Sequence, residues 1–123
     1  LGDVYKRQTI DTQRLVFTSF DIDLLQRLYK KRNDLPVGLI AKGNLSAALA
    51  HLKELPFCYL CLHYPLCYRL TADVLAKLKQ DKTHLSAWTV NTVEDAAKLK
   101  DLGVDSLISD YPTRLLQQLF EER

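Results

Sequence analysis

The stretch that decides the fold covers residues 85–112 and reads LSAWTVNTVEDAAKLKDLGVDSLISDYP. It opens with a short apolar run, Leu85–Val90, which predicts a buried strand. Asn91 or Thr92 can cap the helix that follows. Gly103 marks its end, because a residue without Cβ suits the position after a helix. The run Ser106–Ser109 then predicts a second strand, so the stretch is a strand–helix–strand unit.

The same alternation continues upstream and downstream of this unit. Each predicted strand is short, apolar and bounded by polar residues, Gly or Pro, and each predicted helix has a polar side chain that can accept hydrogen bonds from its first turn. The other predicted strands are Leu15–Phe20, Val37–Ala41 and Cys58–His63. The other predicted caps are Asp21, Asn44 and Thr71, and a last helix begins near Thr113.

Alternating strands and helices predict an α/β fold with a parallel sheet and right-handed crossovers. Two architectures share this order: an open doubly wound sheet and part of a (β/α) barrel. The sequence contains no G-x-G-x-x-G or G-x-x-x-x-G-K-[ST] pattern, so a nucleotide-binding open sheet has no direct support. The pattern alone does not choose between the two.

Composition and charge exclude several classes of protein. The formal net charge is +2 with scattered basic residues, whereas a nucleic-acid binder usually carries a basic patch, so we expect no nucleic-acid partner. The apolar runs are too short to span a membrane, and no export signal is visible. Three cysteines make no disulfide framework and favour a reducing compartment, so we expect a cytoplasmic protein, with a periplasmic one as the alternative.

The first eight residues stand apart from this pattern. The chain contains no Met and begins at Leu1, and Asp3–Gln8 resembles the translation of a transposon end used as a sequencing adapter. We therefore interpret residues 1–8 as an adapter-derived scar without structure, and residues 9–123 as the domain. The alternative is a natural, unstructured N-terminal tail.

Two segments carry a resemblance to a known family. The first, Ser86–Asn91, contains the motif W-T-V-N, and a predicted helix follows it. The second, Gly103–Pro112, reads G-V-D-x-[LI]-I-[ST]-D-x-P. Together they resemble the last two βα units of the glycerophosphodiester phosphodiesterase family. Upstream, Thr18–Asp21 is similar to that family's S-S-F strand end. Leu62-His63 with Leu70-Thr71 resembles its L-H … L-T stretch.

This resemblance, over about residues 14–118, implies the C-terminal half of a (β/α)8 TIM barrel of the PLC-like phosphodiesterase type. Such barrels take about 250 residues, so residues 9–123 would hold the last four to five βα units. The family cleaves glycerophosphodiesters with a divalent cation, Ca²⁺ or Mg²⁺, held by carboxylates, and with two histidines as acid and base. These groups belong to H-R-G, E-x-D and E-x-K motifs that this sequence lacks. We therefore assign no catalytic or metal-binding residue and expect the chain to be inactive alone.

The wall of a substrate pocket is the part of the site that we expect in this chain. Trp88 falls at the end of its strand, where a barrel opens, and would pack against the glycerol or alcohol group; a core tryptophan is the alternative. Phe20 and His63 are further pocket-wall candidates at strand ends. Asn91 and Asp110 could contact a ligand, but helix capping and loop support also explain them.

Cys58, Cys61, His63 and Cys67 lie close together in sequence and raise the question of a zinc site. Residues 58 and 61 are an odd number of positions apart, so on a strand they would point to opposite faces. Buried thiols are the better interpretation.

Two other functions stay open. The chain could belong to another phosphate-binding TIM-barrel enzyme, because phosphate sites commonly use the last two βα loops. It could also be a non-catalytic binding or scaffold module. If it is half a barrel, both edges of its sheet are open, which predicts self-association or dimerisation.

Overall fold

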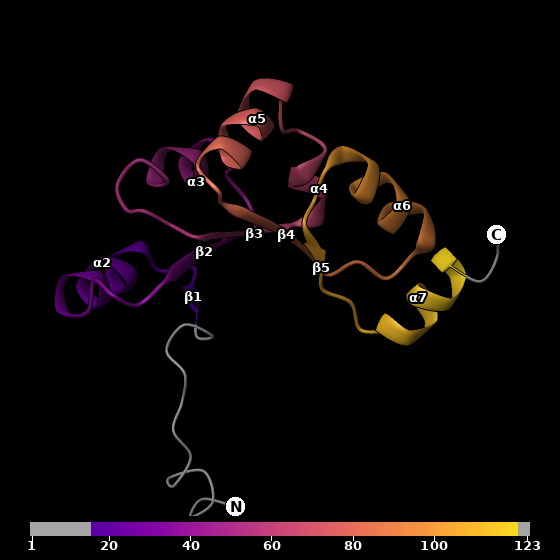
Figure 1. The fold of residues 1–123 in the computed structure, drawn as a ribbon, viewed down its shortest axis with the longest axis horizontal. Helices are drawn as coiled ribbons and strands as arrows, with labels where there is room; N and C mark the ends of the chain where they lie inside the picture. Colours follow the sequence, from indigo (N-terminus) through magenta and orange to yellow (C-terminus); the bar gives the residue numbers. More distant parts are fainter. Residues whose placement is uncertain (1–15, 121–123) are drawn as a thin grey trace, which may run out of the picture.

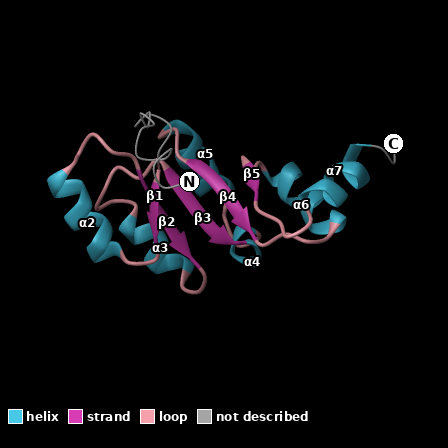
Figure 2. Cartoon of the chain, turned by 90° about the horizontal axis from the view of Figure 1, so that it is seen from below, coloured by secondary structure: helices cyan, strands magenta, loops and turns pink. Residues whose placement is uncertain are grey.

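Five strands form one parallel sheet whose order follows the chain, β1-β2-β3-β4-β5. The computed structural model describes residues 16–120. The predicted scar at residues 1–8 lies outside the described residues, as does Leu15, and the scar therefore stays a prediction. Figure 2 shows β1 to β4 side by side and pointing in the same direction.

The strands are β1 (Phe17–Ser19), β2 (Val37–Ala41), β3 (Tyr59–His63), β4 (His84–Trp88) and β5 (Ser106–Leu107). The helices are α2 (Ile22–Lys31), α3 (Leu45–His51), α4 (Tyr64–Cys67), α5 (Ala72–Gln80), α6 (Val93–Leu102) and α7 (Pro112–Phe120).

The helices follow an arc along one side of the sheet, and the other side carries no helix of the described residues (Figure 1). The core fills the space between sheet and helices. Its strand side chains come from alternate positions, since successive side chains point to opposite faces of a strand. They are Val37, Leu39, Leu60, Leu62, Leu85 and Ala87, and the helices contribute Leu25, Ala48, Leu78, Ala96, Leu99 and Leu115.

This arrangement decides between the two architectures that the sequence left open. A doubly wound sheet has helices on both faces and reverses its strand order at a switch point. Here the order is sequential and the helices share one side. The fold is part of a TIM barrel, as the resemblance implied, with the uncovered side of the sheet corresponding to the barrel interior.

The predicted caps are confirmed in their positions. Asp21, Asn44 and Thr71 accept hydrogen bonds from backbone N–H groups in the first turns of α2, α3 and α5. Thr92, the second of the two candidates, caps α6. Gly103 ends that helix at a φ of 105°, a left-handed conformation that residues with a Cβ disfavour.

The predicted boundaries differ from the structure in four strands. β1 ends at Ser19 rather than at Phe20. β4 begins at His84 and ends at Trp88, whereas the predicted strand ran from Leu85 to Val90. β3 starts one residue later than expected, and β5 is confined to two residues. The four-residue helix α4 was missed, because a single turn with Pro65 in it shows no helical periodicity.

Candidate functional site

The inner face of the sheet is the uncovered side, and it has its own set of side chains. Parallel pairing sets Ile40 beside Cys61, Cys61 beside Ser86, and Ser86 beside Ser106. Two residues further toward the carboxyl ends, on the same face of the sheet, His63 pairs with Trp88. In TIM barrels the carboxyl ends of the strands form the active-site face, so this end of the inner face is the candidate site.

Four rings meet at this end and form the aromatic cluster, which consists of Phe20, His63, Tyr64 and Trp88. The ring centroids of His63 and Trp88 lie 5.0 Å apart, and those of Phe20 and Trp88 lie 6.0 Å apart in an edge-to-face arrangement. His63 also contacts Tyr64, with centroids 5.5 Å apart. The cluster joins the ends of β1, β3 and β4 into one aromatic surface.

A hydrogen bond fixes the orientation of Trp88 within this cluster. Its indole Nε1–H donates to the backbone carbonyl of Cys61 over 3.0 Å. The side chain is half-buried and lies outside the core between sheet and helices, which favours the pocket-wall interpretation over that of a core tryptophan. Phe20 is 60% exposed, which leaves one edge of the cluster open to solvent.

The structure thus brings together all three predicted pocket-wall residues, Trp88, Phe20 and His63, at one end of the sheet. Their contact with a substrate stays a prediction. Tyr64 was not predicted, because it belongs to the short helix α4. Its position directly after His63, at the end of a predicted strand, could have indicated that it belongs to the site.

Asn91 and Asp110 connect the last two βα loops at the same end of the sheet. The Asn91 side-chain amide donates to the Asp110 carboxylate over 3.0 Å, and its oxygen accepts from the Asp110 backbone N–H over 3.0 Å and from Ser109 Oγ over 3.1 Å. Asn91 is therefore a loop brace rather than a helix cap. Asp110 supports the loop, which is one of the three interpretations that the sequence left open for it.

Tyr68 lies directly after α4, next to Tyr64 of the aromatic cluster. Its ring centroid is 6.4 Å from that of Tyr64, and its hydroxyl donates to the Asp95 carboxylate over 2.7 Å. Desolvation of the hydroxyl, together with its hydrogen bond to Asp95, raises the pKa of Tyr68 to about 12. This bond ties α4 to the first turn of α6.

A polar chain crosses the inner face below the aromatic cluster. His84 Nε2 is 2.8 Å from Ser106 Oγ, which donates to Ser86 Oγ over 3.0 Å, and the His84 ring packs on Tyr59 with centroids 4.5 Å apart. The sequence could have predicted that His84 and Ser86 lie on the same face as Trp88, because residues 84, 86 and 88 alternate along one strand.

The thiols and His63 do not form a metal site. Cys61 lies on the inner face, Cys67 is fully buried in the core, and Cys58 donates to the Val37 carbonyl. Burial raises the pKa of Cys67 to about 11, which disfavours the thiolate that binds metals. Within residues 16–120, no three His, Cys, Asp or Glu side chains come together to hold a metal ion. The described residues therefore do not fit the divalent cation that the resemblance implied.

No helix within the described residues is long and apolar enough to cross a membrane.

Comparisons with known proteins agree with this fold. A sequence model described as the glycerophosphoryl diester phosphodiesterase family matches residues 2–114. YhdW of Bacillus subtilis (strain 168), whose name assigns it to the glycerophosphodiester phosphodiesterases, is 35% identical over 49 residues, which cover 40% of this chain and 20% of YhdW.

Two solved structures are similar in fold. A phosphodiesterase of Oleispira antarctica in complex with the product sn-glycerol-3-phosphate has a TM-score of 0.73 and 23% identity, over 95% of this chain and 46% of that one. A glycerophosphodiester phosphodiesterase of Parabacteroides distasonis has a TM-score of 0.73 and 24% identity, over 90% and 45%. The chain thus spans less than half the length of these relatives.

Proposed function

Because the chain belongs to the glycerophosphoryl diester phosphodiesterase family, we propose that it forms part of an enzyme that hydrolyses glycerophosphodiesters. The observation that carries this proposal is the aromatic cluster at the carboxyl ends of β1, β3 and β4, where a barrel of this family binds its substrate. The Oleispira relative, whose structure holds sn-glycerol-3-phosphate, supports a glycerol phosphate as the ligand class.

In this proposal the chain is the C-terminal half of the barrel. Its support is the W-T-V-N and G-V-D … D-x-P pair, which resembles the last two βα units of the family. The brace between Asn91 and Asp110 holds those two loops against each other. The three free thiols favour a reducing compartment, so a cytoplasmic location belongs to the same proposal.

The aromatic cluster would bind and orient the substrate without taking part in proton transfer. Trp88 and Phe20 offer apolar faces and edges against which the carbon skeleton of the glycerol or alcohol group can pack. The Cys61 carbonyl holds the indole ring in place, so little side-chain entropy is lost when a ligand binds. His63 lies between Tyr64 and Trp88, where it can add a hydrogen bond to a ligand hydroxyl.

The chemical step needs groups that the described residues do not bring together. A phosphodiester is an anion, so charge that builds on its oxygens must be neutralised by a metal, and the leaving alkoxide needs a proton from a general acid. Members of the family are typically metal-dependent. We propose that the acid, the base and the metal ligands come from strands that are not part of this sequence.

The first test measures activity of the chain itself. We expect purified residues 1–123 with millimolar Mg²⁺ or Ca²⁺ to release no glycerol 3-phosphate from glycerophosphocholine, because acid, base and metal ligands are missing. Steady hydrolysis that follows the concentration of the chain would contradict this, and heat-denatured chain is the control.

Sequencing the gene in frame upstream of the Thr9 codon should reveal an H-R-G-type strand with paired acidic motifs. A nearby stop codon would favour a binding or scaffold module instead.

The second test probes Trp88 in the protein extended to its own start codon. We expect Trp88→Ala to raise KM for a glycerophosphodiester by about tenfold with little change in kcat, because the ring contributes binding shared by ground state and transition state. Phe120→Ala is the matched control, since Phe120 is an exposed aromatic ring on α7. An unchanged KM in Trp88→Ala would remove Trp88 from the pocket wall.

A further inference from the structure

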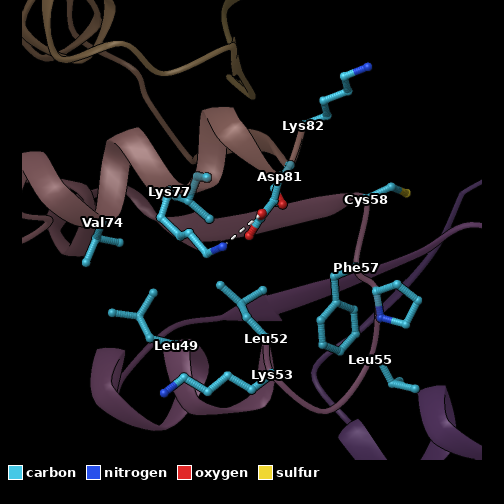
Figure 3. A pocket seen from close by; sticks show the side chains of 13 residues that line it. Leu49, Leu52, Lys53, Leu55, Phe57, Cys58, Val74, Lys77, Asp81 and Lys82 are labelled. Carbon is cyan, nitrogen blue, oxygen red and sulfur yellow. Dashed lines mark hydrogen bonds and ion pairs between the residues drawn. The ribbon is translucent and has the colours of Figure 1, made fainter.

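A cleft of about 510 Å³ lies in the helical layer, away from the aromatic cluster (Figure 3). Its walls are the ends of α3 and α5 and the loop that leads into β3. Cys58 and Thr83, which line it, directly precede β3 and β4. The aromatic cluster lies at the other end of those strands, about 13 Å away along a five-residue strand. The cleft and the proposed substrate pocket are thus separate.

The inside of the cleft is apolar. Leu49 and Leu52 face it from α3 and the turn after it, and Val74 faces it from α5. These three side chains are only half-buried, although aliphatic side chains of this kind gain from full burial. Phe57 and Leu78, both buried, also line the cleft. An apolar chain laid between the two helices would cover the half-buried side chains.

The charged residues of the cleft are mostly cationic. Lys53, Lys77 and Lys82 line it, against a single carboxylate, Asp81. Asp81 pairs with Lys77 over 3.2 Å, and both side chains are exposed, so this ion pair is weak and open to exchange. Figure 3 shows the Lys77 amine over the cleft and the Lys82 amine pointing away from it. The excess positive charge favours an anionic head group and disfavours a cationic one.

We propose that this cleft binds a single-chain amphipathic anion of the medium-chain fatty acid type. The acyl chain lies on Leu49, Leu52 and Val74, and the carboxylate lies beside Lys77, with Lys53 adding positive charge at the wall of the cleft. A volume of this size is in the range of small-molecule sites, and an apolar lining with few polar groups is their usual composition. The inference is independent of the proposed hydrolysis, since it uses none of the residues of the aromatic cluster.

The test is a titration of the ¹⁵N-labelled 123-residue chain with sodium decanoate, followed by amide chemical shifts. We expect saturable shifts around Leu52, Val74 and Thr83. Hexanoate should bind more weakly, by up to about fourfold for each CH₂ group that loses its contact. Decyltrimethylammonium, with the same chain length and a positive head group, should produce no saturable shift there. Shifts confined to the inner face, around Ile40 and Trp88, would overturn the proposal, as would equal binding of the cationic probe or no binding at all.

A pair of matched variants tests the role of the lysines. Lys53→Glu/Lys77→Gln should weaken decanoate binding about fivefold to tenfold, whereas Lys79→Gln/Lys98→Glu carries the same charge change outside the cleft and should leave it within twofold. All four positions are exposed, so both variants should retain the amide spectrum of the folded chain. Equal weakening in the two variants would mean a general attraction to a basic protein and would overturn the proposal.

Discussion

At the scale of single residues, the raised pKa of Tyr68, whose hydroxyl donates to Asp95, makes the stability of the folded chain depend on pH. The pKa of Tyr68 is about 12 in the folded protein, above its ordinary value of 10. The folded state therefore keeps this proton when the unfolded state has lost it. The resulting stabilisation is complete below pH 10 and is lost as the pH rises from 10 to 12.

We expect Tyr68→Phe to lower the free energy of unfolding at pH 8 by about 0.5 kcal/mol, the low end for a hydrogen bond because this one is exposed. The difference between wild type and variant should shrink between pH 10 and 12. Urea denaturation at pH 8 and at pH 11 measures both values. A difference that stays constant over this range would contradict the raised pKa of Tyr68.

Some residues of the candidate site were predicted from the sequence and others were missed. Trp88, Phe20 and His63 were each predicted from a position at a strand end, and the structure places their rings together. Tyr64 and the chain from His84 to Ser86 were missed. Tyr64 lies in a turn too short to show periodicity, and the contacts of His84 depend on where β4 begins.

At the scale of elements, the packing of β2 against its neighbours depends on Gly38. A Cβ at this position would lie 2.9 Å from Thr18 Cγ2 on β1 and 2.9 Å from Tyr59 Cβ on β3. Atoms this close must move apart, and the Tyr59 Cβ is fixed to the backbone of its strand. A Cβ at Gly43, in the loop after β2, would meet no atom of the described residues within 4 Å.

We expect Gly38→Ala to lower the free energy of unfolding by about 1–3 kcal/mol, as overpacking does. Gly43→Ala should leave it unchanged or raise it by up to about 1 kcal/mol, because alanine restricts the unfolded chain. Equilibrium unfolding in urea compares the two variants. Equal effects would show that the strands adjust around position 38 without cost.

At the scale of the whole molecule, β1 and β5 are the edges of the described sheet, since each pairs with one neighbour only. The Phe17 backbone N–H donates to the Pro36 carbonyl, so by alternation the N–H of Thr18 points to the open edge. Free edge donors of this kind recruit further strands. Self-association through these edges, expected from the sequence, stays a prediction.

We expect the sedimentation coefficient of residues 1–123 to rise with concentration. Thr18→Pro should reduce this rise, because proline removes the edge donor and leaves the hydrogen bond of Phe17 to Pro36 intact. The control is Thr18→Val, which keeps the N–H. Association that is equal in both variants would exclude the β1 edge as the contact.

The sequence by itself determined the order of strands and helices, the caps at Asp21, Asn44 and Thr71, the glycine at Gly103 and the family resemblance. These depend on residues close together in the chain, so local patterns record them. Only the tertiary structure decided that the sheet is a barrel segment, that Thr92 rather than Asn91 is the cap, and that Asn91 braces Asp110. Those features depend on which side of the sheet each crossover takes and on contacts between residues about twenty positions apart, which a pattern of adjacent residues does not encode.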